Sequence, residues 1–341
     1  MTEATETIQI TKPPFPWFGG KSRVAEIVWQ RFGDVPNYVE PFFGSGAVLL
    51  LRPHPPGIET INDIDCYVAN FWRAVQTDPD AVAEYADWPV NEADCHARHK
   101  WLLHQADFRE RLRTEPDYYD AKIAGWWVWG QCQWIGCGWC DSRCYDGKRE
   151  EWKQLPHLGD AGQGVHRPSQ QRPHLGDAGR GVHRPSHKLP HLGNAGQRGL
   201  LEYMAAIAQR LRRVRVCCGD WSRICGPTPT THMGLTGVFL DPPYMDTRDS
   251  RLYANDSQTV AADVHAWAEA NGDNPKLRIA VCGYEGEWEP PDDWETVEWK
   301  AAGGYGSAAN LRGRDNAHRE RIWFSPHCLR TSKSVQAMLW D

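Results

Sequence analysis

One short segment of the chain combines hydrogen-bond acceptors with an aromatic ring. Asp241-Pro242-Pro243-Tyr244 follows an apolar stretch that is predicted to be a strand. Two prolines hold the backbone extended and remove two N–H donors, so the carbonyls and the Asp241 carboxylate remain as acceptors beside the Tyr244 ring. Such a group of acceptors suits an exocyclic amine on a planar base. A proline-rich strand end within a turn, with no ligand, is the structural alternative.

A glycine-rich turn forms a second candidate site. Residues 38–46 read Tyr-Val-Glu-Pro-Phe-Phe-Gly-Ser-Gly, which predicts a strand, a tight turn and a helix start. Gly44 and Gly46 let a ligand approach the backbone, and the helix N-terminus offers unpaired N–H groups to an anion. The segment is not G-x-G-x-x-G, so a nucleoside carrying a small carboxylate fits better than a dinucleotide pyrophosphate. A turn without a ligand is again the alternative.

An acidic residue ends the next predicted strand. Asp63 lies 23 residues after Glu40, in the segment Asn62-Asp63-Ile64-Asp65. A carboxylate at this place can accept hydrogen bonds from ribose hydroxyls. The alternative role is that of a helix N-cap, for which Asp65 is better placed than Asp63.

The elements that must position these residues alternate between strands and helices. Helices are predicted at 26–32, 67–75, 200–213 and 260–271, and strands at 38–40, 60–63, 214–218, 237–240, 278–282, 295–300 and 321–324. This order predicts an α/β fold with a doubly wound, mostly parallel sheet. Such sheets bind ligands beyond the carboxyl ends of their strands, which is where the candidate motifs fall.

The motifs occur in an order that resembles a known family, the N6-adenine-specific DNA methyltransferases of the Dam type. The segments that carry the resemblance are Pro-Phe-Pro-Trp-Phe-Gly-Gly-Lys at 14–21, Glu-Pro-Phe-Phe-Gly-Ser-Gly at 40–46, Asp-Pro-Pro-Tyr at 241–244 and Arg-Glu-Arg-Ile-Trp-Phe-Ser-Pro at 319–326. The resemblance covers about half of the chain, residues 13–75 and 200–326. It implies a Rossmann-like, S-adenosylmethionine-dependent methyltransferase fold with an inserted helical or irregular target-recognition domain.

The resemblance also implies roles for single residues. Trp17 and Lys21 would hold the methionyl end of S-adenosylmethionine, Asp63 the ribose, and Asp220 and Trp221 the cofactor adenine. A solvated lysine at a helix start is the alternative for Lys21. The full set of implied cofactor-binding residues is Trp17, Lys21, Glu40, Phe42, Gly44, Gly46, Asp63, Asp220 and Trp221.

The implied chemistry is methyl transfer to adenine N6 in duplex DNA, with Asp241, Pro242, Pro243 and Tyr244 as the catalytic residues. Hydrogen bonds from N6–H to Asp241 and to the Pro242 carbonyl would localise the amine lone pair toward the methyl group. Alignment of the amine with the methyl group then accelerates the transfer, and no covalent enzyme intermediate is needed. The target base must leave the duplex, and Tyr244 would stack on it.

The chain is expected to divide into a polar tail, a discontinuous catalytic domain and an insertion, at residues 1–12, 13–76 with 200–341, and 77–199 respectively. The insertion contains a repeat with a period of 17 residues: Pro-His-Leu-Gly-Asp-Ala-Gly begins at Pro156 and Pro173, and a close copy begins at Pro190. The repeat has few large apolar residues, so it cannot build its own core.

Charge is distributed unevenly along the chain. Residues 148–215 carry 13 Lys and Arg against 5 Asp and Glu, although the whole chain has a net charge of -6. We therefore expect the insertion to contact double-stranded DNA, with a mobile solvated loop as the alternative. The expected DNA-binding residues are Arg167, Arg172, Arg180, Arg184 and Lys188, with a second basic patch at Arg312, Arg314 and Arg319. The tryptophans at 126–139 are better explained as a small core.

Cysteine and hydropathy patterns exclude some classes of protein. The chain has 11 Cys, no visible secretory signal and no apolar run near the ~18 residues of a membrane span, which predicts a cytoplasmic protein of a bacterial or phage-infected cell with reduced thiols. We expect a monomer. Cys132, Cys137, Cys140 and Cys144 could bind zinc, but free thiols among tryptophans are favoured, so no metal is expected. Transfer to cytosine N4 or to an RNA base, and an inactive DNA-binding module of the same fold, remain alternatives. A cognate restriction endonuclease is a possible partner.

Overall fold

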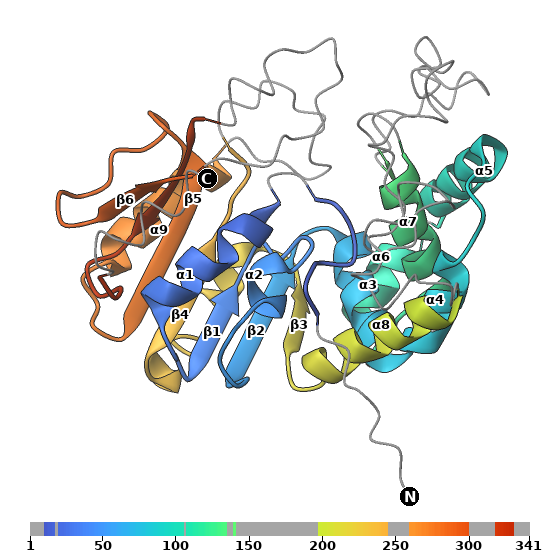
Figure 1. Ribbon diagram of the computed structural model, residues 1–341, viewed down its shortest axis with the longest axis horizontal. Coiled ribbons are helices and arrows are strands. Elements are labelled where there is room, and N and C mark those ends of the chain that lie inside the picture. Colours follow the sequence, from blue (N-terminus) through green and yellow to red (C-terminus); the bar gives the residue numbers. More distant parts are fainter. Residues whose placement is uncertain are drawn as a thin grey trace, which may run out of the picture. The chain divides into compact units, whose positions relative to one another are not determined.

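The computed structural model divides the chain into two compact units (Figure 1). The sheet unit comprises Trp17–Ile64 and Arg213–Asp341, and the helical unit comprises Met1–Pro16 and Asp65–Arg212. The structure describes residues 10–17, 20–105, 107–134, 139–140, 197–244, 259–299 and 318–330.

The sheet unit is built on seven strands in the order β3-β2-β1-β4-β5-β7-β6. Their bounds are β1 Asn37–Glu40, β2 Ile58–Asp63, β3 Arg215–Cys218, β4 Thr236–Leu240, β5 Leu277–Tyr284, β6 Glu295–Glu298 and β7 Glu320–Phe324. The five strands from β3 to β5 pair in parallel, whereas β7 pairs antiparallel with both β5 and β6. The predicted mostly parallel α/β sheet is confirmed. The antiparallel β7 was not predicted.

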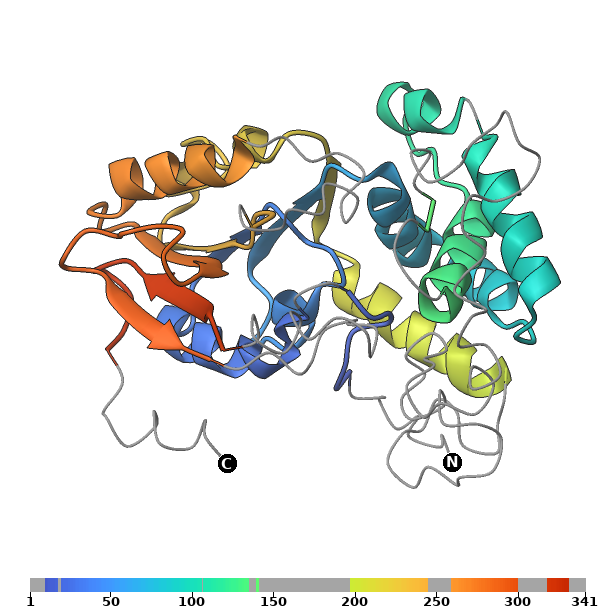
Figure 2. The ribbon, with the colours of Figure 1, turned by 90° about the horizontal axis from the view of Figure 1, so that it is seen from above.

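Helices cover both faces of this sheet, as Figure 2 shows for α1 and α9. Tyr38 of β1 packs against Trp29 of α1, with ring centroids 4.9 Å apart. The next residue, Val39, lies in a core cluster with Val264 of α9. Because neighbouring side chains of a strand point to opposite faces, α1 and α9 lie on opposite sides of the sheet. The helical segments of this unit are η1 Lys21–Arg23, α1 Ala25–Phe32, α2 Ala47–Leu50, η5 Trp221–Ile224, η6 Thr231–Met233 and α9 Val260–Asn271.

Six helices form the described part of the helical unit, namely α3 Cys66–Thr77, α4 Pro79–Ala86, α5 Glu92–Leu103, α6 Phe108–Thr114, α7 Ala121–Gln133 and α8 Gln197–Leu211. Several begin where an N-cap side chain accepts a hydrogen bond from the first turn. Asp65 caps α3 through Tyr67 N at 2.8 Å, as its position in the sequence predicts, and Asp120 caps α7. None of the described helices has the length and apolar character required to span a membrane.

Aromatic side chains form the core of the helical unit. Phe15 packs edge-on against Phe71 of α3 and Trp127 of α7, with ring centroids 5.2 and 5.1 Å apart. Trp127 and Trp129 are 2% and 0% exposed. The interpretation of these two tryptophans as core residues is therefore confirmed.

The unit boundaries differ from those expected from the sequence. Helices α3 and α8, which were expected in the catalytic domain, belong to the helical unit, as does Phe15. The reason is packing, because α3 lies against both α7 and α8, and Phe15 is buried between α3 and α7.

Candidate active site

The order of the strands brings the two main motifs to one place. From β1 the chain continues to β2 on one side, whereas β4 and β5 lie on the other side. Such a point of divergence, at the carboxyl ends of parallel strands, is where open α/β sheets bind ligands. Pro41–Gly46 follows β1 and Asp241–Tyr244 follows β4, so both motifs leave the sheet at this edge.

The glycine turn after β1 is contacted by Trp17 on one side and by Asp63 on another. Gly44 and Gly46 have φ of 47° and 70°, a conformation that favours glycine. A Cβ on Gly44 would collide with the indole of Trp17, which lies directly over the turn. Gly44 N donates a hydrogen bond to Asp63 Oδ2 at 3.0 Å. The structure thus brings together four of the residues predicted to bind the cofactor.

A stacked aromatic pair lies beside this turn. The rings of Phe42 and Trp221 are 6.1 Å apart at an interplanar angle of 29°, and Trp267 of α9 contacts Trp221 edge-on. Asp220 accepts a hydrogen bond from Ser222 N at 3.0 Å and so caps η5. The turn after β3 therefore has a defined shape where it carries two of the predicted residues.

Asn62 connects the turns that follow β1 and β3. Its Nδ2 donates to the carbonyls of Pro41 at 3.0 Å and Gly219 at 2.9 Å, and the side chain is buried. The sequence analysis did not identify this role. An amide within a strand gives no sign of which distant carbonyls it will reach.

A buried polar cluster forms where β4 ends. Lys21 Nζ lies 2.9 Å from Asp241 Oδ1 and donates to the Tyr244 hydroxyl at 3.1 Å. That hydroxyl is also 2.9 Å from Glu320 Oε2, on β7, and 3.3 Å from Asp241 Oδ1. The exposed fractions of the Lys21 and Asp241 side chains are 6% and 17%. We call Lys21, Asp241, Tyr244 and Glu320 the β4-end cluster.

Burial and charge oppose each other in this cluster. Burial alone would lower the pKa of Lys21, but Asp241 and Glu320 raise it above its ordinary value. Burial raises the pKa of the Asp241 carboxyl, and the charge of Lys21 works against that rise. Burial also raises the pKa of Glu320 and Tyr244. The ammonium of Lys21 is therefore the group that stabilises ionised Asp241 in this environment.

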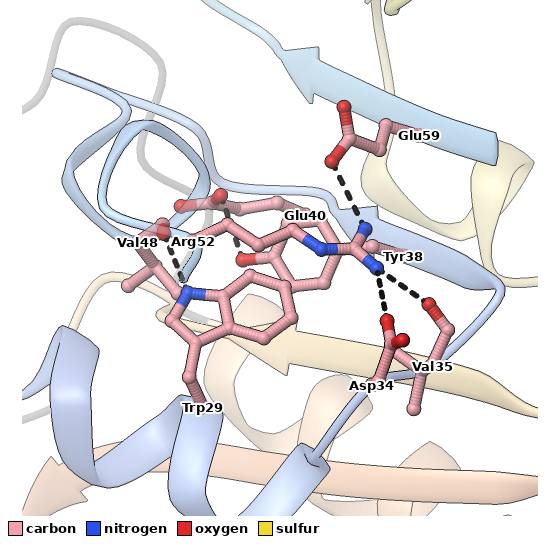
Figure 3. Close-up of polar contacts among 8 residues, drawn as sticks. All are labelled: Trp29, Asp34, Val35, Tyr38, Glu40, Val48, Arg52 and Glu59. Atoms are coloured by element: carbon pink, nitrogen blue, oxygen red, sulfur yellow. Dashed lines mark hydrogen bonds and ion pairs between the residues drawn. The ribbon is translucent and has the colours of Figure 1, made fainter. Parts of the chain in front are cut away.

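Glu40 is enclosed within the sheet unit. Its Oε2 accepts a hydrogen bond from the Tyr38 hydroxyl at 2.8 Å, and the residue is 2% exposed (Figure 3). Burial raises the pKa of Glu40 well above its ordinary value. These contacts give Glu40 a part in holding the start of the glycine turn, and its expected contact with the cofactor stays a prediction.

Behind Glu40 lies a buried ion pair. Arg52 Nη1 is 3.0 Å from Glu59 Oε1, and its Nη2 donates to the Val35 carbonyl at 2.6 Å (Figure 3). The guanidinium lies 5.0 Å from the centre of the Trp29 ring. This group holds the segment after α2 against the start of β2 and against the segment that precedes β1.

The sequence analysis missed Glu320 and Tyr284 as members of the site. Glu320 pairs in register with Tyr284 of β5, and the Tyr284 ring packs edge-on against Tyr244 at 4.5 Å. Glu320 does fall within the segment that resembles the closing strand of the family. The pattern of β7 gives no indication, however, that this carboxylate reaches a tyrosine 76 residues away.

Some predicted residues lie outside the described part of the chain. These are Arg167, Arg172, Arg180, Arg184, Lys188, Arg312 and Arg314, together with Cys137 and Cys144. Arg319 is described and lies over the Tyr284 ring at 5.4 Å. Cys132 and Cys140 are buried, and burial raises the pKa of Cys140 well above its ordinary value. Among the described residues, no group of His, Cys, Asp or Glu side chains could hold a metal ion.

Comparison with known proteins identifies the class of enzyme. Residues 17–120 match the family described as D12 class N6 adenine-specific DNA methyltransferase. The match includes the glycine turn, Lys21 and Asp63, and it ends before Asp241. No curated protein matches the chain. The family match, together with a mostly parallel sheet covered by helices on both faces, indicates an adenine-specific DNA methyltransferase.

Proposed function

We propose that the protein transfers a methyl group from S-adenosylmethionine to the N6 amine of adenine in duplex DNA. The observation that carries the proposal is the convergence of the glycine turn after β1 and Asp241–Tyr244 after β4 at the point where the strand order diverges. A site for a nucleoside and a site for an amine then lie at adjacent strand ends.

The residues at the first strand end fit the cofactor. Asp63 can accept hydrogen bonds from ribose hydroxyls, and the stacked pair of Phe42 and Trp221 supplies aromatic surface for an adenine ring. Gly44 and Gly46 keep the adjoining backbone free of side chains. When bound, S-adenosylmethionine supplies a methyl group made electrophilic by its sulfonium.

Lys21 has two prospective anionic partners. Its ammonium points at Asp241 Oδ1 and the Tyr244 hydroxyl, whereas the resemblance assigns it to the carboxylate of the cofactor. An ammonium has three donors, so one lysine can serve both anions. The contact with the cofactor carboxylate stays a prediction.

The segment after β4 supplies acceptors for the target amine. Pro242 and Pro243 have no N–H, and the contacts of Asp241 with Lys21 and Tyr244 both engage Oδ1. We assign Oδ2 and the Pro242 carbonyl to the two N6 hydrogens. Acceptance of these hydrogens draws the amine lone pair out of conjugation with the ring. When N6 gains the methyl group, the proton that it gives up would pass to the Asp241 carboxylate that accepts its hydrogen bond, and from this partly exposed side chain to solvent.

An adenine stacked in duplex DNA cannot reach these acceptors, so we include base flipping in the proposal. Extrusion of a base costs a few kcal/mol, which stacking and hydrogen bonds in the site must offset. The Tyr244 ring, held edge-on by Tyr284, provides the stacking surface.

Double-stranded DNA is the proposed partner of the basic segment at 148–215, with 13 Lys and Arg against 5 Asp and Glu. Each phosphate contact makes affinity more dependent on salt. Deletion of residues 156–196 should weaken DNA binding and flatten its salt dependence, as measured by fluorescence anisotropy. Unchanged affinity would contradict this part of the proposal.

The central test identifies the methylated base. The full chain is incubated with S-adenosylmethionine that carries a labelled methyl group and with unmethylated DNA, and the nucleosides are then separated. We expect N6-methyladenine as the labelled product. Asp241→Ala should abolish the label, because it removes the acceptor of the amine hydrogens.

A matched control separates chemistry from folding. Asp273 belongs to the same unit, and its side chain is fully exposed, so Asp273→Asn should retain wild-type activity. Labelled N4-methylcytosine would contradict the assignment to adenine. Absence of label with both the wild type and Asp273→Asn would reject the proposed function. Label on RNA but not on DNA would contradict the assignment to DNA and make an RNA base the substrate.

A further inference from the structure

The Tyr244 hydroxyl has one proton, and two carboxylates of the described residues lie within reach of it. Glu320 Oε2 is 2.9 Å from it and Asp241 Oδ1 is 3.3 Å from it. Lys21 can only donate, so its hydrogen bond at 3.1 Å occupies a lone pair of the hydroxyl and leaves the proton to a carboxylate. The shorter distance directs that proton to Glu320.

The sheet holds Glu320 firmly in this position. The residue is 4% exposed, and it pairs with Tyr284 in the antiparallel ladder between β5 and β7. Tyr284 in turn packs edge-on against Tyr244. One pair of strands therefore fixes both the ring of Tyr244 and the acceptor of its proton.

We propose that Glu320 is a positioning residue that keeps the hydroxyl proton of Tyr244 away from Asp241. This inference rests on the proposed function and names one more residue that serves it. Asp241 must accept hydrogen bonds from the target amine. A second donor on the same carboxylate would reduce its capacity as an acceptor and weaken the activation of the amine.

Replacement of Glu320 has a specific consequence. In Glu320→Ala the hydroxyl keeps its proton and its contact with Lys21, and among the residues that the structure describes the carboxylate still within reach is Asp241, through Oδ1. Glu320→Gln retains a side-chain carbonyl that can accept the proton. The alternative is that Glu320 only supports β7, in which case the Tyr244 hydroxyl should not influence the effect of its loss.

A double-mutant cycle distinguishes these two roles. Single-turnover methylation at saturating S-adenosylmethionine and DNA is measured for the wild type, Glu320→Ala, Glu320→Gln, Tyr244→Phe and the double variant Glu320→Ala/Tyr244→Phe. We expect a loss of about 10-fold in Glu320→Ala and of less than about 3-fold in Glu320→Gln. The double variant should recover to the rate of Tyr244→Phe, because removal of the hydroxyl removes the misdirected donor.

A carboxylate at the opposite end of β7 serves as the control. Glu295 of β6 is paired with Arg31 at 2.6 Å and does not belong to the β4-end cluster. Glu295→Gln should lower the melting temperature without lowering the methylation rate. Melting curves for all variants show which of them are folded.

The outcomes are decisive in both directions. Recovery in the double variant, with rescue by glutamine, supports the positioning role. Losses that multiply in the double variant, or a Glu320→Gln rate as low as that of Glu320→Ala, would overturn it while the proposed function stands. A wild type that forms no N6-methyladenine would overturn both.

Discussion

The two units bury their cations in different ways. In the described part of the sheet unit each of four buried cations faces a carboxylate, in the pairs Lys21–Asp241, Arg52–Glu59, Arg31–Glu295 and Arg321–Glu285. In the helical unit the guanidinium of Arg98 lies among indoles instead, 4.3 Å from the ring of Trp129 and 5.1 Å from that of Trp88. Its Nη1 has no hydrogen-bond partner within the described part of the chain.

The architecture explains this difference. The carboxyl ends of parallel strands meet at one edge of the sheet, where Lys21 offsets Asp241, whereas Glu59 and Glu295 lie at the starts of β2 and β6 and pair with arginines. Helix α7 instead presents tryptophans, whose faces attract a cation without any carboxylate. We infer that the Lys21–Asp241 pair serves chemistry, whereas the Arg52–Glu59 and Arg31–Glu295 pairs and the buried Arg98 serve packing.

Loss of the Lys21 cation should have the largest effect. Lys21→Met leaves Asp241 and Glu320 buried without a positive partner, which typically costs about 3–5 kcal/mol. Chemical denaturation should show a loss of this size, and methylation should cease. A loss below about 1 kcal/mol would show that Asp241 does not depend on the ion pair.

The pH dependence of stability shows whether an aromatic neighbour stabilises the charged imidazole of His265 within the sheet unit. Its imidazole stacks on Trp288 at 4.8 Å and 3°, and burial lowers the pKa of His265 to about 4. The unfolded chain therefore binds more protons between the ordinary pKa of 6.5 and about 4, so stability falls as pH falls through this range.

As pH falls through this range, the titration of His265 is expected to lower the free energy of unfolding by on the order of 2 kcal/mol. His265→Phe keeps a stacked ring but cannot titrate, so the pH dependence of unfolding should be weaker in this variant than in the wild type. Parallel pH profiles would show instead that stacking on Trp288 stabilises the charged imidazole as well as the neutral one.

Arg98→Met is the counterpart of Lys21→Met in the helical unit. Methionine fills much of the same volume, and no buried carboxylate loses a partner, so we expect a loss of only about 1 kcal/mol from the cation–π contacts. Thermal unfolding followed by circular dichroism measures this loss. A cost equal to that of Lys21→Met would remove the distinction between the two units.

Local features of the fold could be predicted from the sequence, but distant pairings could not. The turn around Gly44, the cap at Asp65 and most strands are encoded by neighbouring residues, and they are found where they were predicted. The contact of Lys21 with Tyr244 joins residues 223 positions apart, and it depends on which strands become neighbours. Alternation of helices and strands indicates parallel pairing, so the antiparallel β7, and with it the position of Glu320, could not be derived.

A similarly small change in stability should come from Asp65, two residues from Asp63 but in the other unit. Asp65 caps α3, and Asp65→Ala should cost about 1 kcal/mol without changing affinity for S-adenosylmethionine. Asp63 holds Gly44 N at the carboxyl edge of the sheet, so Asp63→Ala should weaken cofactor binding at least about 10-fold. Isothermal titration calorimetry measures both affinities. Equal affinities in the two variants would show that the cofactor does not use the strand end where Asp63 lies.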